Sequence, residues 1–277
     1  MHLVVTGAKG MLGHRVAAVA HARGHAVTAT DLPELDLLDE GAVRDFVERK
    51  APDAIVNCAA YTDVDACEDH EELATRVNGE AAGNVARCGV PVVHVSTDYV
   101  FPGDEARRSP YVESDEPAPR TAYGRSKLAG EQQVREAGDQ HAIVRTAWLF
   151  GEGGKNFVDT MLRLGAERDE VSVIFDQVGS PTWTGHLAPA LVGVAERGGS
   201  GIYHGAGAGA CSWFELAIEA MRLRELDCRV VAITSDEYPS RTPRPAFSVL
   251  ATERDDGIRL PDWHEGVEAH VKEVVPA

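Results

Sequence analysis

Short apolar runs alternate with stretches of helical spacing through the first half of the chain. The apolar runs, typical of buried strands, are residues 3–6, 26–30, 54–58, 92–96 and 142–146. The stretches with apolar residues at helical spacing are residues 11–23, 40–49, 71–87 and 122–136. Strands that are apolar throughout, each followed by an amphipathic helix, predict a parallel sheet covered on both faces. The pattern therefore indicates the α/β class, with a Rossmann-type doubly wound sheet whose ligand site lies beyond the carboxyl ends of the strands.

After residue 146 the alternation becomes less regular. Ser212, followed three residues later by Glu215, predicts a capping box at the start of a helix. Residues 238–245 include three prolines and two arginines, which favours an ordered turn or loop over a helix. We expect residues 1–150 to form the sheet domain and residues 151–277 to form a smaller region interleaved with it.

Charge and cysteine content exclude several classes of protein. The formal net charge is −17, which argues against a nucleic-acid partner, because a phosphate backbone needs a basic face. The five cysteines are an odd number without a CxxC pair, so we expect neither a disulfide framework nor a metal site. No apolar run approaches the length of a membrane span, and the first residues lack the pattern of a signal peptide. Together these features predict a cytoplasmic protein without a membrane partner.

Three glycines, spaced as GxxGxxG, stand between the first predicted strand and the first helix. Gly7 is suited to a tight turn, Gly10 to close approach of the backbone to a phosphate, and Gly13 to close packing of helix and strand. Met11 and Leu12 would lie at the N-terminus of the helix, where free N–H groups bind phosphates. The pattern predicts a dinucleotide cofactor, NADPH or NADH, bound by the sheet domain.

Asp31 ends the second predicted strand, 18 residues after Gly13. An acid at this place hydrogen-bonds the adenosine ribose and disfavours a 2′-phosphate, which would favour NADH. Lys9 and Arg15 lie near the glycine loop and could soften this preference, so the choice of cofactor stays open. Further candidates for contact with the adenine and the ribose are Asp36, Leu37, Ala59, Ala60 and Tyr61.

Tyr123 and Lys127 are four residues apart and therefore share one face of a predicted helix. A lysine ammonium beside a phenol stabilises the phenolate and lowers the pKa of the tyrosine, so Tyr123 would protonate a carbonyl oxygen as a hydride arrives at its carbon. Thr97, at the carboxyl end of the fourth predicted strand, offers a hydroxyl that would orient the same carbonyl. These residues predict an NAD(P)-dependent oxidoreductase.

Several longer motifs occur in a fixed order along nearly the whole chain. They are NCAAYT at residues 57–62, STDYVF at 96–101, YGRSKLAGE at 123–131, RTAWLFG at 145–151, DQVGSPT at 176–182 and RPxxSVL at 244–250. In this combination the chain resembles the dTDP-4-dehydrorhamnose reductase family of extended short-chain dehydrogenases. STDYVF and RPxxSVL are more specific than the glycine motif and the tyrosine–lysine pair, which many dehydrogenases share.

The resemblance implies reduction of the C4 keto group of a dTDP-linked deoxysugar, dTDP-4-dehydro-L-rhamnose, to dTDP-L-rhamnose. It makes Tyr123 the proton donor, Lys127 its partner and a ribose ligand, and Thr97 the substrate-orienting hydroxyl. Asp98 and Trp148 would also contact the sugar, and Arg244 is our candidate for gripping the diphosphate. Some family members form a magnesium-bridged dimer, but its acidic residues have no clear match here, so we expect no metal and leave a homodimer open.

Other functions fit parts of the same pattern. Nucleotide-sugar 4-epimerases and 4,6-dehydratases share the fold and the tyrosine–lysine pair, although a dehydratase commonly has Asp-Glu after the catalytic threonine, where this chain has Asp98-Tyr99. A related 4-ketoreductase of another deoxysugar pathway is a closer alternative. A different class is a non-catalytic regulatory subunit of the methionine adenosyltransferase type, which the intact Thr97, Tyr123 and Lys127 disfavour.

Overall fold

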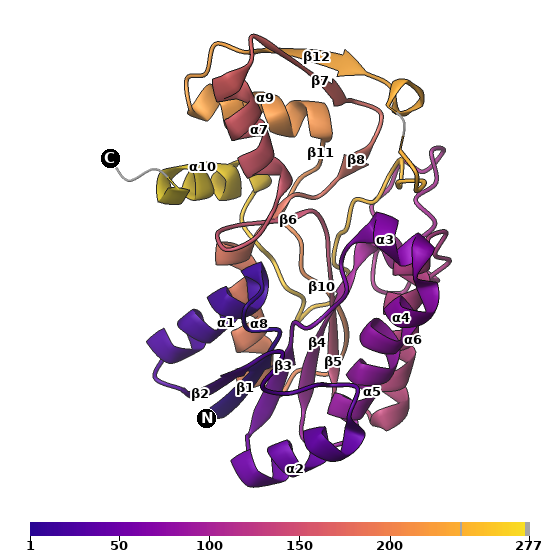
Figure 1. The fold of residues 1–277 in the computed structure, drawn as a ribbon, viewed down its shortest axis with the longest axis vertical. Coiled ribbons are helices and arrows are strands. Elements are labelled where there is room, and N and C mark those ends of the chain that lie inside the picture. Colours follow the sequence, from indigo (N-terminus) through magenta and orange to yellow (C-terminus); the bar gives the residue numbers. More distant parts are fainter. Residues whose placement is uncertain (239, 275–277) are drawn as a thin grey trace.

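A six-stranded parallel sheet forms the centre of the molecule in a computed structural model that describes residues 1–238 and 240–274. The strands are β1 (His2–Thr6), β2 (Ala26–Thr30), β3 (Ala54–Asn57), β4 (Val92–Thr97), β5 (Ala142–Thr146) and β10 (Gly201–His204). They lie in the order β2-β1-β3-β4-β5-β10, and every neighbouring pair is parallel (Figure 1). This confirms the predicted Rossmann-type α/β fold.

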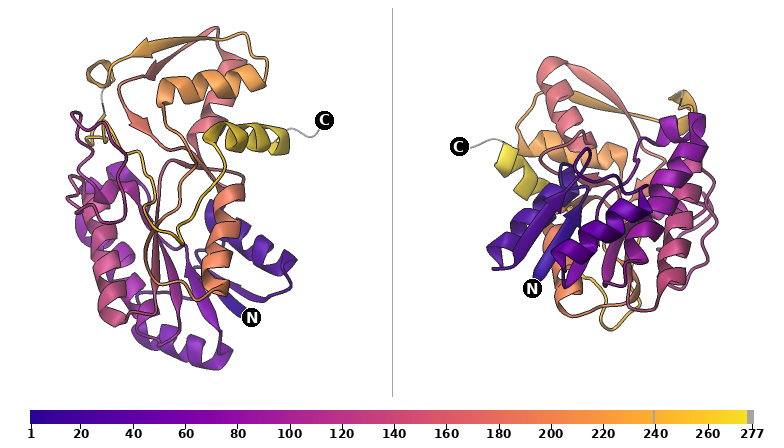
Figure 2. Two further views of the ribbon diagram at one scale, coloured as in Figure 1. Left: turned by 180° about the vertical axis from the view of Figure 1, so that it is seen from behind. Right: turned by 60° about the horizontal axis from the view of Figure 1, so that its bottom comes forward.

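Helices cover both faces of the sheet, as Figure 2 shows in two further views. On one face, α1 (Met11–Ala22) packs against α8 (Thr184–Glu196). The opposite face carries α2 (Glu40–Lys50), α5 (Ala81–Ala86) and α6 (Ala122–Ala137). Because crossover connections place helices on both faces, strands such as β3 are buried along their whole length.

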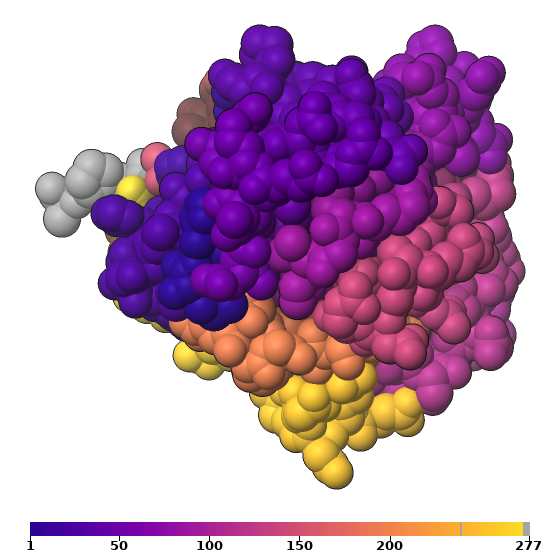
Figure 3. All heavy atoms as spheres, turned by 90° about the horizontal axis from the view of Figure 1, so that it is seen from below, coloured from indigo at the N-terminus to yellow at the C-terminus, as the bar shows by residue number. Residues whose placement is uncertain are grey.

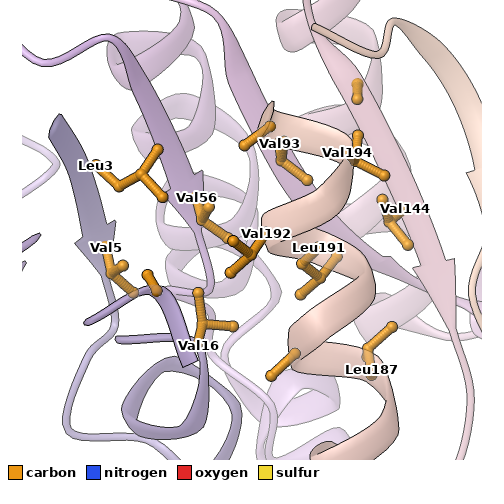
Figure 4. Close-up of a cluster of buried hydrophobic side chains, with 14 of the residues drawn as sticks. Leu3, Val5, Val16, Val56, Val93, Val144, Leu187, Leu191, Val192 and Val194 are labelled. Carbon is orange, nitrogen blue, oxygen red and sulfur yellow. The ribbon is translucent and has the colours of Figure 1, made fainter. Parts of the chain in front are cut away.

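Alternating side chains along β1 pack into two separate cores, one on each face of the sheet. Leu3 and Val5 of β1 point to α1 and α8, whereas Val4 points to the α2 side. In Figure 4, Leu191 and Val192 of α8 lie against the sheet side chains of this first core. Because successive side chains point to opposite faces of a strand, a strand that is apolar throughout predicts burial on both faces.

The helix predicted over residues 71–87 is instead three segments. These are α4 (Glu71–Thr75), a π-helical turn (Arg76–Glu80) and α5, and they follow a further helix, α3 (Val64–Asp69). Within the π turn, the Asn78 amide bonds both backbone groups of Tyr61, at 2.7 and 3.0 Å, and the Ser126 hydroxyl at 2.9 Å. Widening of the helix at Asn78 accompanies these tertiary bonds, which helical periodicity does not reveal.

The C-terminal elements form a second layer above the carboxyl ends of the strands (top of Figure 1). They are β6 (Leu149–Phe150), α7 (Phe157–Glu167), β7 (Glu170–Ile174), β8 (Val178–Gly179), β9 (Thr182–Trp183), β11 (Cys211–Ser212), α9 (Trp213–Leu223), β12 (Arg229–Ile233) and α10 (Trp263–Val274). The predicted capping box is confirmed: Ser212 Oγ accepts from Glu215 N at 3.2 Å, and Glu215 Oε2 accepts from Ser212 N at 2.7 Å. Of the predicted loop 238–245, residue 239 lies outside the described residues, and the rest contains no helix.

The sheet layer draws on both halves of the chain. β10 pairs with β5 at the edge of the sheet, and Arg254 Nη1 donates to the Ile202 carbonyl of β10 at 3.1 Å. Seen from below, orange and yellow parts of the C-terminal half lie on the surface beside the indigo and magenta N-terminal half (Figure 3). α8 and β10 come from the C-terminal half of the chain but belong to the sheet layer. The functional division near residue 150 stays a prediction. In the part of the chain that the structure describes, no helix has the length and apolar character needed to cross a membrane.

Candidate active site

A cleft of about 830 Å³ opens where β1 and β3 end, between the sheet layer and the C-terminal layer. The chain runs from β1 outward to β2 and then crosses back to β3, so the connections diverge at this point. In doubly wound folds such a switch point is where ligands bind. The cleft contains most of the residues selected from the sequence.

The glycine motif forms one wall of the cleft. Gly7 has a φ of +65°, and a Cβ on Gly13 would lie 2.2 Å from the Gly7 carbonyl oxygen, so side chains are excluded at both places. Gly10 occupies the N-cap position of α1 and has no side chain that could bond the free N–H groups of the first turn. Met11 and Leu12 of that turn also line the cleft. The N-terminus of α1 therefore presents N–H groups and a partial positive charge to the cleft, which suits a phosphate group.

Asp31 lies in the cleft at the end of β2, and backbone N–H groups hold its carboxylate. Its Oδ2 accepts from Lys9 N at 2.9 Å, and its Oδ1 accepts from Leu32 N at 2.8 Å. Each carboxylate oxygen has a further lone pair that a ribose hydroxyl could use. The Lys9 ammonium, by contrast, bonds the Glu34 carboxylate at 2.9 Å and does not pair with Asp31.

Of the other cofactor candidates, four line the cleft and one does not. Those in the cleft wall are Asp36, Leu37, Ala59 and Ala60. Tyr61 is not among the lining residues, because its backbone is bonded to Asn78 and its ring packs in a small cluster with Cys67 and Tyr123. Its predicted contact with the cofactor stays a prediction.

Tyr123, Lys127 and Thr97 meet in the cleft from two elements. The first two lie on α6, and Thr97 is the last residue of β4. Burial raises the pKa of the Tyr123 phenol, an effect that the Thr97 hydroxyl partly opposes. Burial thus acts in the direction opposite to the one we expected from Lys127, whose Nζ donates to the Val95 carbonyl at 2.7 Å. A tyrosine with a raised pKa is protonated at neutral pH, as a general acid must be.

Lys127 is itself buried, with 2% of its surface exposed. Burial lowers its pKa to about 8, against the opposing influence of the Glu131 carboxylate and the Cys58 thiol. Glu131 is held by two bonds from the buried Arg145 guanidinium, at 2.9 and 2.7 Å, and by the Ser96 hydroxyl at 2.6 Å. This buried network ties α6 to β4 and β5 and so fixes the helix that carries Tyr123.

Asp98 lies beside these residues, with only 2% of its surface exposed. Its Oδ1 accepts from the Thr97 hydroxyl at 3.1 Å, and its Oδ2 has no partner among the described residues. Burial raises the pKa of Asp98 to about 6, although the nearby Ser248 and Thr97 hydroxyls act in the other direction. A carboxyl with a raised pKa at the wall of a cleft is typical of a ligand site.

Trp148 lines the cleft from the turn after β5, with a φ of +47°. Its ring stacks on that of Trp213, with centroids 3.4 Å apart and an interplanar angle of 4°. A Cβ on Gly179 would lie 2.4 to 2.7 Å from three atoms of the Trp148 ring, so Gly179 lies close against this indole. Trp148 is thus held firmly, with Trp213 beside it in the cleft wall.

Arg244 does not line the cleft. Its guanidinium pairs with Asp65 at 2.9 Å and lies 3.4 Å from the Tyr99 hydroxyl, and the Tyr99 ring packs edge-on against Tyr123. Lys155 and Trp213 do line the cleft but were not among our site residues. Trp213 follows the capping Ser212, yet nothing in its local sequence indicates that its ring stacks on Trp148. Among the described residues, no group of three or more His, Cys, Asp or Glu side chains could hold a metal.

Known proteins are similar to this chain over nearly its whole length. The model of the RmlD substrate binding domain family matches residues 1–275. A dTDP-4-dehydrorhamnose reductase of Mycolicibacterium smegmatis is 43% identical, over 99% of this chain and 86% of its own length. A dTDP-4-keto-6-deoxy-D-glucose reductase of Streptomyces niveus is also 43% identical, over 89% of this chain and 87% of its own length.

A solved structure agrees with the fold over nearly its full length. The dTDP-4-dehydrorhamnose reductase of Bacillus anthracis, in complex with NADP, is 37% identical and superposes with a TM-score of 0.94 over 98% of this chain and 99% of that one. A family model that spans almost every residue, relatives above 40% identity and a matching fold all agree with the cleft described above. The chain therefore belongs to the RmlD substrate binding domain family.

Proposed function

We propose that this protein is an NAD(P)H-dependent 4-ketoreductase of dTDP-linked deoxysugars, and that its substrate is dTDP-4-dehydro-L-rhamnose. The observation that carries the proposal is the meeting of Tyr123, Lys127 and Thr97 with the glycine motif in one cleft. The names of the full-length relatives support the class of substrate.

The cofactor cradle fits a dinucleotide. The uncapped N-terminus of α1 and the close approach allowed by Gly7 and Gly13 suit a pyrophosphate, and Asp31 suits the adenosine ribose. When bound, the nicotinamide supplies the hydride that reduces the ketone. We propose that NADPH and NADH are both accepted, because Asp31 favours NADH while a relative is known in complex with NADP.

Tyr123 would act as the general acid. Its raised pKa keeps the phenol protonated at neutral pH, so the proton is available to the C4 oxygen as that oxygen gains charge. With substrate bound, the Thr97 hydroxyl would exchange its bond to Asp98 Oδ1 for one to the same oxygen and fix its direction. Asp98, which lines the cleft beside Thr97, would accept from a sugar hydroxyl.

The remaining parts of the substrate would meet two different surfaces. The stacked Trp148 and Trp213 offer an apolar wall that suits the 6-methyl group and ring face of a deoxysugar. The diphosphate needs a cation, and besides Lys127 the only cation among the lining residues is Lys155. Arg244, our first candidate, is paired with Asp65, so we propose that Lys155 makes the main diphosphate contact in this protein of net charge −17.

The test should include a second substrate, dTDP-4-keto-6-deoxy-D-glucose, because the Streptomyces niveus relative is named as its reductase. The protein would be incubated with each dTDP-4-keto sugar and with NADPH or NADH, following cofactor oxidation and product configuration by NMR. We expect stoichiometric oxidation and dTDP-L-rhamnose from the first sugar. Faster turnover of the second would change the substrate and keep the reaction. Sugar conversion without net oxidation would indicate an epimerase, and no reaction with either sugar would favour a regulatory subunit.

A further inference from the structure

A buried histidine lies directly behind the catalytic lysine. His94, in the middle of β4, is fully buried, and its Nε2 is 3.4 Å from Lys127 Nζ. Its other ring nitrogen, Nδ1, is 3.2 Å from the side-chain amide nitrogen of Asn57 on β3. The mechanism proposed above gives His94 no role.

The hydrogen bonds around Asn57 determine which ring nitrogen of His94 carries the proton. Asn57 Oδ1 must be the atom facing Ala59, because the backbone N–H of Ala59 can only donate, at 3.2 Å. The Thr6 hydroxyl donates to the same oxygen at 2.7 Å. The amide nitrogen of Asn57 therefore faces His94 and donates to Nδ1, which must be an acceptor.

Burial holds the pKa of His94 well below its ordinary value, so the ring is neutral and carries one proton. With Nδ1 accepting, that proton is on Nε2 and points at the lysine nitrogen. An ammonium has no lone pair to receive it, whereas an uncharged amine has one. The amine would then accept from His94, donate one N–H to the Val95 carbonyl and keep one N–H for the cleft.

We infer that His94 is a positioning residue for Lys127: its Nε2–H, fixed by Asn57, favours the uncharged amine and directs one amine N–H into the cleft. The other titratable groups that act on Lys127 are Glu131 on α6 and Cys58 after β3, and Tyr123 lies one turn before it on α6. Glu131 favours the charged form, but its carboxylate is already bound by Arg145 and Ser96. The consequence for turnover rests on the proposed function, whereas the arrangement itself does not.

The first test needs neither substrate nor cofactor. The ¹⁵N spectrum of the imidazoles in the full chain reports which nitrogen of each histidine carries the proton, and a His94→Phe variant identifies the His94 signals. We expect His94 with its proton on Nε2. A proton on Nδ1, or a doubly protonated ring at neutral pH, would overturn the inference, and if His94→Phe does not fold, His94→Gln assigns the same signals.

The second test follows the titration of Lys127. The chain has only five lysines, so ¹³Cε labelling gives a simple spectrum in which Lys127→Met assigns the signal. Removing the opposing N–H in His94→Phe should raise the titration midpoint of Lys127 by about one pH unit. The matched control is His141→Phe, which removes another buried imidazole, bonded to Val92 N at 3.2 Å, and should leave Lys127 unchanged. Equal midpoints in the wild type and His94→Phe would refute the role of His94.

A third measurement separates this inference from the proposed function. If the protein is a ketoreductase whose turnover needs the Lys127 ammonium, kcat falls as Lys127 loses its proton, and this alkaline limb of the profile should move upward in His94→Phe by the same amount as the Lys127 midpoint. If the Lys127 midpoint shifts but the limb of the kcat profile does not, His94 affects Lys127 only in the free protein and has no effect on turnover. Absence of reductase activity would contradict the proposed function and leave both spectroscopic results decisive for His94.

Discussion

Tyr123 is the residue on which the proposed chemistry depends most directly. Replacing it with phenylalanine keeps the ring packed against Tyr99 and removes only the phenol. Because general-acid catalysis is lost, kcat should fall by roughly 10²–10⁴-fold while NADPH still binds. Steady-state kinetics and a cofactor titration check both parts. Tyr203→Phe, which removes a hydroxyl bonded to Asp256 outside the cleft wall, is the matched control. Turnover near that of the wild type would exclude Tyr123 as the acid.

Asp31 should set the balance between the two cofactors. If its carboxylate binds the ribose diol, Asp31→Ala should weaken NADH more than NADPH and shift the ratio of their dissociation constants by about tenfold. The substitution also removes the acceptor of Lys9 N and Leu32 N, so Asp31→Asn, which keeps one acceptor, serves as a companion. Equal weakening of both cofactors would mean that Asp31 only holds the glycine loop in place.

Lys155 and Arg244 give different expectations for the diphosphate. Lys155 lines the cleft, and Arg244 does not. Lys155→Ala should therefore raise the KM for the dTDP-sugar by about tenfold, since a charge-assisted bond contributes roughly 1.5–3 kcal/mol. Arg244→Ala should have a smaller effect, because its guanidinium is engaged by Asp65. Lys50→Ala, at the end of α2, controls for the change of net charge. A larger effect at Arg244 would restore that residue as the diphosphate ligand.

Among the secondary-structure elements, β8 and β11 determine where the aromatic wall stands. Their pairing, Gly179 with Cys211 and Val178 with Ser212, brings the start of α9 against Trp148. Local signals specify the helix, through the Ser212 capping box, but only this pairing brings Trp213 to the cleft.

Gly179 tests this arrangement. In Gly179→Ala the new Cβ would lie 2.4 Å from Cε2 of Trp148, whose ring cannot move aside because Trp213 is stacked on it. We expect a loss of about 1–3 kcal/mol in the free energy of unfolding and a raised KM for the sugar, with the Kd for NADPH unchanged. Gly41→Ala in α2, where a Cβ would make ordinary contact at 3.4 Å, is the control and should not destabilise. An unperturbed variant at position 179 would mean that the tryptophan stack yields easily.

At the scale of the whole molecule, the active site lowers the stability of the fold. Asp98 is the clearest case, because burial raises its pKa from 3.8 to about 6. The folded protein therefore disfavours the ionised form relative to the unfolded chain. The resulting destabilisation is absent below about pH 4, grows between pH 4 and 6, and reaches about 3 kcal/mol above pH 6.

Asp98→Asn removes this ionisation and should stabilise the protein at neutral pH. Urea unfolding at pH 4.5 and pH 7.5 measures the effect: the advantage of the variant over the wild type should be small at the lower pH and about 3 kcal/mol at the higher. The same variant should lose activity if Asp98 accepts from a sugar hydroxyl. An advantage that does not depend on pH would show that Asp98 is not ionised differently in the folded and unfolded states.

The sequence by itself determined the alternation of strands and helices up to residue 146, the parallel class of the sheet, the glycine cradle and the tyrosine–lysine pair. These features depend on local periodicity, on glycine conformations and on residues four apart on one helix, so neighbouring residues are enough to specify them. Only the tertiary structure decided that Trp213 and Lys155 line the cleft, that Tyr61 and Arg244 do not, and that the helix over residues 71–87 contains a π turn.

The pKa values of the site were decided at the same level. The spacing of Tyr123 and Lys127 suggested a lowered tyrosine pKa, whereas burial raises it and the lysine bonds the Val95 carbonyl instead. Burial and the direction of a long side chain depend on residues far apart in the chain, such as His94 on β4 and Cys58 after β3 around Lys127. A motif names the groups that meet, and the packing around them sets their charge.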